Sequence, residues 1–248
     1  MNYTSLVLKI LSLPLFLVAW QLVVTTGTVN AVLFPPPTDV AQAAFHWVTN
    51  GPFWSDLWSS LSRVLVGFAL GAGLGTVIGL LSGRYTLFHA LVSPIFTILR
   101  PIPPIAFVPL VILWFGLGEG GKYFLVFWGV FFTVWISTHI GVQSVSPNYI
   151  RVGQCLGAND RDTFFHILLP ASIPYVLVGM RTAVSVSFYT LVAAEIAGTE
   201  SGIFYRIDIS QTNMQIGTAM AGLLALGLIS LIADRLFSLV SNRLLWSE

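Results

Sequence analysis

Residues 64–83, VLVGFALGAGLGTVIGLLSG, contain no charged side chain over twenty positions. A helix needs roughly 20 mostly apolar residues to cross the core of a bilayer. Within this stretch a glycine recurs every four residues, at Gly67, Gly71, Gly75, Gly79 and Gly83. Positions spaced in this way lie on one face of a helix, where small residues let a neighbouring backbone approach closely. The stretch therefore predicts a membrane helix packed tightly in a bundle, with a flexible hinge as the alternative use of the glycines.

The whole composition agrees with a lipid environment. Hydrophobic residues make up 56% of the 248 residues and charged residues only 8%, whereas soluble domains carry about 25% charged residues. Because lipid offers no partner for free backbone groups, an open chain crosses it only as helices. The sequence therefore predicts an all-α integral membrane protein with six transmembrane helices, at about 6–24, 57–82, 87–115, 122–145, 171–197 and 217–240.

The chain divides by composition into two parts. Residues 1–56 hold a first transmembrane helix and a polar, proline-rich external segment, and residues 57–248 hold a five-helix core that includes the polar segment 146–170. No small-residue cleavage site follows the first apolar run, so we expect a retained helix rather than a removed signal peptide.

Charges in the loops indicate the orientation of a multi-pass protein. Cytoplasmic loops carry an excess of Lys and Arg. With the N-terminus inside, the inner loops and ends hold five arginines, whereas five of the ten acids fall in the outer segments. The inner arginines are Arg84, Arg151, Arg161, Arg235 and Arg243. This pattern predicts that both termini and segment 146–170 lie in the cytoplasm.

The third predicted span is interrupted by Arg100-Pro101-Ile102-Pro103-Pro104. Prolines remove backbone donors and break helices, and broken helix at membrane depth survives only when it is buried in protein or lines a water-filled cavity. Arg100 could cap the freed carbonyl groups, or it could face a pathway and attract anions. A third alternative is that the span is placed differently and Arg100 lies near a membrane interface.

Two further charged residues fall in the fifth predicted span. Glu195 could form an ion pair or take part in a gate. Arg181 could extend to the inner membrane surface, or act with Arg100 on an anionic substrate. Arg100, Arg181 and Glu195 are therefore the candidate residues of a translocation pathway.

Segment 146–170 has the pattern of two short helices joined at a glycine. Ser146 and Pro147 form a typical helix start, and Gly157 can adopt the left-handed conformation that ends a helix. Asn159 suits the cap of a second helix, which we expect Pro170 to close before the fifth span.

Several classes of function are excluded or disfavoured. The chain has no GxxxxGK[ST] phosphate loop, so it cannot readily supply an ATP site of its own. A net charge of +1 does not favour nucleic acid, and the single Cys155 excludes a disulfide and a CxxC metal site. Histidines without metal-ligand spacing predict no metal site. A stand-alone channel or secondary transporter, and an intramembrane enzyme, remain as alternatives to a subunit of a larger transporter.

The cytoplasmic segment carries a family signature. Gly157 is followed by nine residues and then Ile167-Leu168-Leu169-Pro170, which is similar to the second half of the signature of permease subunits in bacterial binding-protein-dependent ABC importers. The first half departs from that pattern, with Arg151-Val152-Gly153 where the family has E-A-A. Further motifs along the chain resemble the branch that imports nitrate, bicarbonate, sulfonates and taurine. They are Leu33-Phe34-Pro35-Pro36-Pro37, Ser60-Leu61-Ser62-Arg63, Trp114-Phe115-Gly116, Gly179-Met180-Arg181 and Ala194-Glu195.

The resemblance implies a type I ABC importer permease fold in the bacterial cytoplasmic (inner) membrane. It implies that the chain passes a small solute, an oxyanion, by alternating access, and that separate ATPase subunits hold the ATP and Mg while this chain binds no cofactor. A coupling helix would sit in a groove of each ATPase, an external solute-binding protein would deliver the substrate, and a second copy of the chain would complete a homodimer in the lipid. The implied coupling residues are Gly157, Ala158, Asn159, Asp160, Arg161, Thr163, Phe164 and Phe165.

Overall fold

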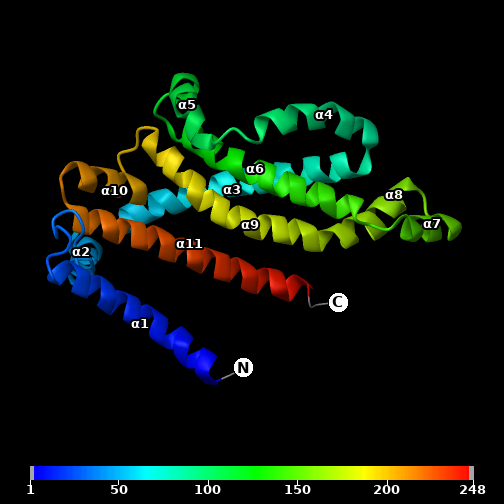
Figure 1. The fold of residues 1–248 in the computed structure, drawn as a ribbon. Coiled ribbons are helices and arrows are strands. Elements are labelled where there is room, and N and C mark those ends of the chain that lie inside the picture. Colours follow the sequence, from blue (N-terminus) through cyan, green and yellow to red (C-terminus); the bar gives the residue numbers. More distant parts are fainter. Residues whose placement is uncertain (1–2, 246–248) are drawn as a thin grey trace. The chain divides into compact units, whose positions relative to one another are not determined.

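The computed structural model describes the backbone of residues 3–245 and the side chains of residues 11–243, and within these residues it contains helices joined by turns and loops, and no strands (Figure 1). In chain order the helices are α1 (Tyr3–Thr25), α2 (Pro37–Asn50), α3 (Phe53–Arg84), α4 (Thr86–Leu99), η1 (Pro104–Phe107), α5 (Val108–Phe115), α6 (Glu119–Gln143), α7 (Pro147–Cys155), α8 (Asp160–Thr163), η2 (Phe164–Leu168), α9 (Leu169–Ile196), α10 (Ile203–Thr212) and α11 (Ile216–Leu245).

Four helices of the described chain are long and apolar enough to cross a membrane, and the bent pair α4 and η1–α5 makes a fifth span if it is counted once. They correspond to the predicted spans two to six. The predicted first span lies in α1, but the side chains of residues 6–10 fall outside those described, so the count of six stays a prediction. Apart from α7, α8 and η2, which fall in the segment 146–170 where two short helices were predicted, two helices lie outside the predicted spans: α2, within the external segment, and α10, after the fifth span.

The glycine row of α3 packs against α6. A Cβ atom built on Gly67 would lie 2.5 Å from the Cβ of Val126, and one on Gly79 would lie 2.5 Å from the Cβ of Thr138. Side-chain carbons do not approach this closely, so only glycine permits the observed spacing of the two helices. The prediction of tight packing is confirmed for this face.

Helices α6 and α9 form the second close pair and run side by side (Figure 1). Small residues again set the contact, because Gly129 of α6 faces Thr190, and Gly179 of α9 faces Ser137. The apolar core lies in the same region and includes the fully buried residues Leu125, Val126, Val130, Val134, Ala183 and Ala194.

The interruption of the third predicted span is a real break. Helix α4 and the η1–α5 pair are bent by 84° relative to one another. Pro101, Pro103 and Pro104 cannot donate a backbone hydrogen bond, and the carbonyl of Ile102 instead accepts one from Trp128 Nε1 at 3.3 Å.

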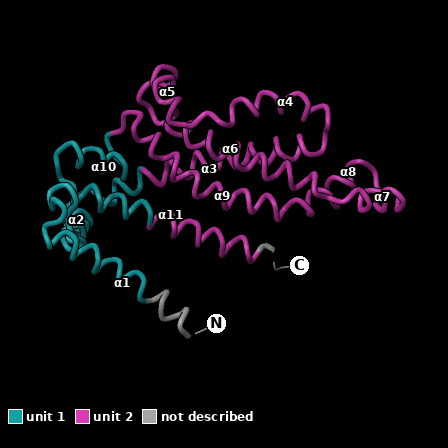
Figure 2. The backbone as a smooth tube through the Cα atoms, viewed as in Figure 1, with its two compact units in different colours: residues 1–59, 200–227 teal, residues 60–199, 228–248 magenta. Residues whose placement is uncertain are grey.

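The chain forms two compact units (Figure 2). Unit 1 contains residues 1–59 and 200–227, and unit 2 contains residues 60–199 and 228–248. The predicted division at residue 56 was contiguous in sequence, whereas the structure groups α10 and the start of α11 with the N-terminal segment. One reason is Asp56 in unit 1, whose carboxylate accepts a hydrogen bond from the Gly202 backbone N–H at 3.2 Å.

Candidate functional site

Segment 146–170 has the local structure that its cap residues indicate. Ser146 caps α7, accepting a hydrogen bond from the backbone N–H of Asn148. Gly157 follows α7 with φ +87°, in the left-handed region that favours glycine. Asn159 and Asp162 then form a reciprocal capping box at the start of α8. The turn between α7 and α8 is therefore fixed by one glycine and two side-chain caps.

The expectation that Pro170 closes this segment is wrong. Residues from Asp160 to Ile196 form one continuous helix that passes through Pro170. A wider turn, η2, comes directly before, and in it the N–H of Leu169 bonds to the carbonyl of Phe164, five residues back. A π turn locally shifts which carbonyl each backbone N–H reaches. Here the π turn comes just before Pro170, which has no backbone N–H to donate. The predicted coupling helix, α8, is therefore the exposed first turn of the same continuous helix that contains α9. A movement of α8 would act directly on this membrane span.

Segment 146–170 presents apolar side chains to its surroundings. Tyr149, Val152, Leu156 and Phe165 are each more than half exposed. In a segment predicted to lie outside the lipid, an exposed apolar group of this kind marks a contact surface. Among the implied coupling residues, Thr163 differs because its side chain is buried.

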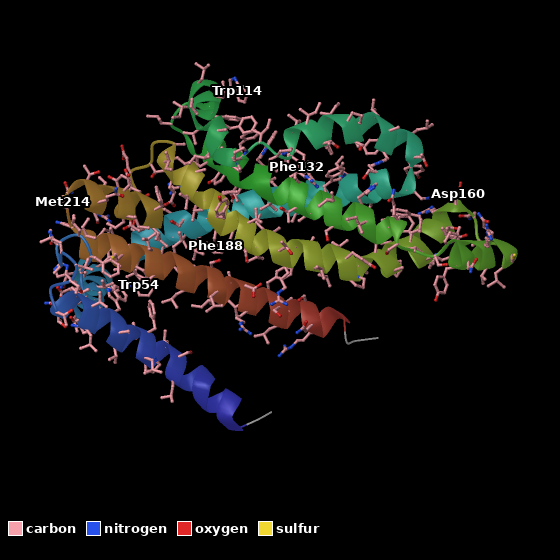
Figure 3. The ribbon with its side chains drawn as sticks, viewed as in Figure 1. Trp54, Trp114, Phe132, Asp160, Phe188 and Met214 are labelled. Atoms are coloured by element: carbon pink, nitrogen blue, oxygen red, sulfur yellow. The ribbon has the colours of Figure 1, made fainter. Side chains whose placement is uncertain are left out.

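Helix α3 is tied to this segment by an ion pair. Arg84, the last residue of α3, donates from Nη2 to Asp160 Oδ1 at 3.0 Å. Figure 3 labels Asp160 at the end of the bundle where α7 and α8 lie. Because Asp160 is the first residue of α8, the pair joins the glycine-row helix to the predicted coupling helix.

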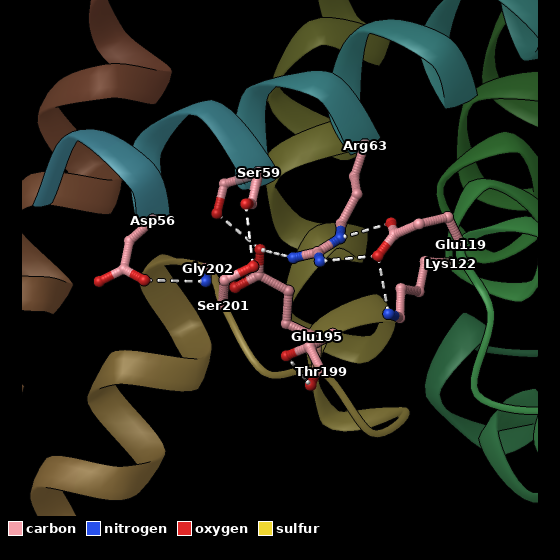
Figure 4. A network of polar contacts seen from close by, with 10 residues as sticks. Asp56, Ser59, Arg63, Glu119, Lys122, Glu195, Thr199, Ser201 and Gly202 are labelled. Atoms are coloured by element: carbon pink, nitrogen blue, oxygen red, sulfur yellow. Dashed lines mark hydrogen bonds and ion pairs between the residues drawn. The ribbon is translucent and has the colours of Figure 1, made fainter. Parts of the chain in front are cut away.

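A second cluster of charged residues lies in unit 2, and Figure 4 shows it from close by. Arg63 of α3 has 3% of its side chain exposed and binds two carboxylates. Its Nη1 lies 3.0 Å from Glu195 Oε1, while its Nε and Nη2 each lie 2.9 Å from an oxygen of Glu119. Lys122 donates to Glu119 at 2.8 Å, and Ser60 donates to Glu195 at 2.6 Å.

This cluster joins three membrane helices. Arg63 comes from α3, Glu119 from the start of α6 and Glu195 from the end of α9. Charged groups are costly inside a membrane protein unless they are paired and hydrogen-bonded, and each charge here has an opposite partner. Sequence reasoning singled out Glu195 alone. The sequence also held features that point to Arg63 and Glu119. Arg63 stands at the start of an apolar span, and Glu119 precedes Lys122 by three residues, a spacing that places both on one helix face.

Unit 1 has its own buried carboxylate, also drawn in Figure 4. Asp56 is 1% exposed and accepts hydrogen bonds from Trp47 Nε1 at 3.3 Å, from the Gly202 N–H at 3.2 Å and from Arg206 Nε at 3.0 Å. It therefore holds α2, α3 and α10 together. No sequence motif indicated this role.

The three predicted pathway residues have different surroundings. Arg181 forms an ion pair with Asp234 of α11, with Nε–Oδ1 at 3.1 Å, instead of extending freely to the membrane surface. Glu195 belongs to the cluster around Arg63. Arg100 is exposed at the end of α4, and among the described side chains its guanidinium has neither an acid nor a carbonyl group as partner. The structure gives no support to the capping role of Arg100, and its place in a pathway stays a prediction.

The arrangement described so far is mechanical rather than catalytic. It consists of close-packed membrane helices, a broken span and a capped segment with exposed apolar side chains. Residues 75–246 match the family described as binding-protein-dependent transport system inner membrane component. The chain is 36% identical to a probable ABC transporter permease protein of Brucella abortus, over 99% of this chain and 97% of the relative.

Two relatives are named for what they transport. The chain is 32% identical to a putative aliphatic sulfonates transport permease protein of Bacillus subtilis, covering 96% of this chain and 87% of the relative. It is 28% identical to a nitrate import permease protein of Synechocystis, covering 96% and 88%. The chain therefore belongs to the family of inner membrane components of binding-protein-dependent transport systems, the permease subunits of ABC importers.

Proposed function

We propose that this permease passes a small oxyanion across the bacterial inner membrane by alternating access, and that the segment 157–165 couples it to partner ATPases. Two copies of the chain would enclose the pathway, and a solute-binding protein would deliver the anion from outside. Both termini and the coupling segment would lie in the cytoplasm, as the positions of Arg84, Arg151 and Arg161 indicate.

The proposal rests chiefly on the geometry of the coupling segment. A glycine with positive φ and a capping box hold α8 in a defined orientation, and Phe165 beside it is 51% exposed. Since α8 continues into α9 without a break, a partner that binds α8 and moves can drive a membrane span. A channel or a secondary transporter would not need a rigid apolar contact surface at this place.

The oxyanion is proposed from two observations. Relatives that match over most of this chain are named for sulfonates and for nitrate. In addition, Arg100 is exposed beside the break in the third span, where a fixed positive charge would attract an anion.

Coupling can be tested with Phe165→Ser in the permease co-expressed with its ATPase. Burying a phenylalanine side chain in an interface contributes about 1.5–3 kcal/mol, so retention of the ATPase on the purified permease should fall about tenfold or more. The measurement is the ratio of ATPase to permease after affinity purification in mild detergent, together with ATP-dependent uptake in proteoliposomes.

Phe45→Ser is the matched control, because Phe45 is an exposed phenylalanine on α2, in the segment predicted to face the outside. This control should keep the ATPase. Equal retention in both variants, with full uptake, would contradict the assigned coupling surface. Uptake by the permease without any ATPase would favour a secondary transporter instead.

A further inference from the structure

The break between α4 and η1 leaves irregular backbone in a span of the membrane. Pro101, Pro103 and Ile105 of this break are exposed rather than covered by other parts of the described chain. Irregular backbone at membrane depth is tolerated where it is buried in protein or lines a water-filled cavity. The chain itself does not bury these residues, so either a second copy covers them or they line water, and the groove beside them favours water.

A groove follows the break. It has a volume of about 370 Å³ and is lined by residues 100–104, by one face of α6 that includes Thr133, and by Tyr189 of α9. Figure 3 labels Phe132, another of its lining residues, on α6. A second, smaller hollow continues from it along α9, and Pro103, Pro104 and Tyr189 line both.

Tyr189 is unusual for a residue in this place. Its side chain is 78% exposed, although it lies seven residues before the end of α9, which is about 10 Å along the helix. Tyrosines in membrane proteins usually gather at the interface with water. This tyrosine instead shares a groove with Arg100, so a guanidinium and a phenol hydroxyl both border the same opening beside the broken span.

The wall behind this groove is rigid. Gly129 of α6 packs against Thr190 of α9, with a built Cβ only 2.5 Å from the threonine methyl carbon. The hydroxyl of Thr133 donates to the carbonyl of Gly129 at 2.8 Å, which fixes its orientation and leaves its oxygen able to accept a hydrogen bond. Polar groups on so fixed a wall are preorganised to contact a passing solute.

We propose that this groove is one wall of the translocation pathway, and that Tyr189 and Arg100 contact the anion as it passes. The Tyr189 hydroxyl and the Arg100 guanidinium both donate hydrogen bonds, which a small oxyanion accepts. The same groove in a second copy of the chain forms the opposite wall. This inference rests on the proposed import function. It concerns which surface of the permease is in contact with water, and water access can be measured without a transport assay.

The first test measures water access with Tyr189→Cys in the assembled permease–ATPase complex in lipid nanodiscs. A charged, membrane-impermeant thiosulfonate reacts with thiolates, which form readily in water and poorly in an apolar environment. Leu228→Cys on α11 is the control, because Leu228 is a 59% exposed apolar residue near the middle of its helix. Mass spectrometry separates either label from that on the natural Cys155.

The thiol introduced by Tyr189→Cys should react about tenfold faster or more than the one at position 228, and the anion-loaded binding protein with ATP should slow it. Equal, slow reaction at both positions would show that position 189 is shielded from water, by lipid or by a neighbouring subunit, and would overturn the inference. This result would leave the proposed function intact, because association with the ATPase is measured separately by co-purification.

The second test measures transport. Tyr189→Phe keeps the ring and removes only the hydroxyl, while Arg100→Gln removes the charge. Loss of one hydrogen bond to an anion should lower the uptake rate about tenfold or more, with the ATPase still bound. Unchanged uptake in both variants would mean that neither group contacts the solute, and would also overturn the inference.

Discussion

Gly75→Leu is expected to prevent the permease from reaching a stable fold. A Cβ at this position would lie 2.8 Å from the carbonyl oxygen of Phe131 and 3.1 Å from the backbone nitrogen of Trp135. Backbone atoms of α6 cannot move aside as a side chain does, so α3 and α6 would have to separate. Overpacking a core costs typically about 1–3 kcal/mol, and this contact falls at or above the upper end. The measurement is the yield of monodisperse protein in detergent and its apparent melting temperature.

Gly73→Leu is the control on the same helix. A Cβ on Gly73 meets no atom within 4 Å, and both substitutions replace glycine with a residue that favours helix. We expect this variant to be as stable as the parent protein or slightly more stable. Equal melting temperatures for the two variants would show that the close approach of α3 to α6 does not matter for stability.

The glycine row shows how far sequence reasoning reaches in a membrane protein. Apolar length and the four-residue spacing predicted helix α3 and its close-packed face, because both follow from local pattern and from the properties of lipid. The break after Arg100 and the cap at Asn159 were predicted for the same reason, since proline and cap residues act on the backbone within a few positions.

Contacts between distant segments could not be predicted in this way. Arg63 and Glu195 are 132 positions apart and Asp56 and Arg206 are 150 apart, and no local spacing indicates which charge finds which partner. The passage of the helix through Pro170 was also missed, because it depends on a π turn that no residue type signals. The exposure of Tyr189 depends on how α4, α6 and α9 assemble, which the sequence of α9 alone does not specify.

Arg63→Met is expected to have the second large effect, since it removes the cation at the centre of the buried cluster. Glu195, whose side chain is fully buried, would lose its ion pair, and Glu119 would lose its two hydrogen bonds to the guanidinium. Leaving one partner of a buried pair uncompensated costs about 3–5 kcal/mol. The melting temperature of the detergent-solubilised protein should therefore fall sharply. Arg84→Gln should change it little, because the partner of Arg84, Asp160, is 90% exposed in the segment predicted to lie in the cytoplasm.

The double variant Arg63→Met with Glu195→Gln distinguishes an unpaired charge from lost packing. Neutralising Glu195 removes the uncompensated charge, while Lys122 still pairs with Glu119 at 2.8 Å. If the unpaired charge of Glu195 is the main cause of the stability lost in Arg63→Met, the double variant should melt at a higher temperature than Arg63→Met alone, since coupled residues deviate from additivity. A double variant that is less stable than Arg63→Met would instead assign the loss to the packing of the arginine side chain. The cluster would then hold α3, α6 and α9 together by shape rather than by charge.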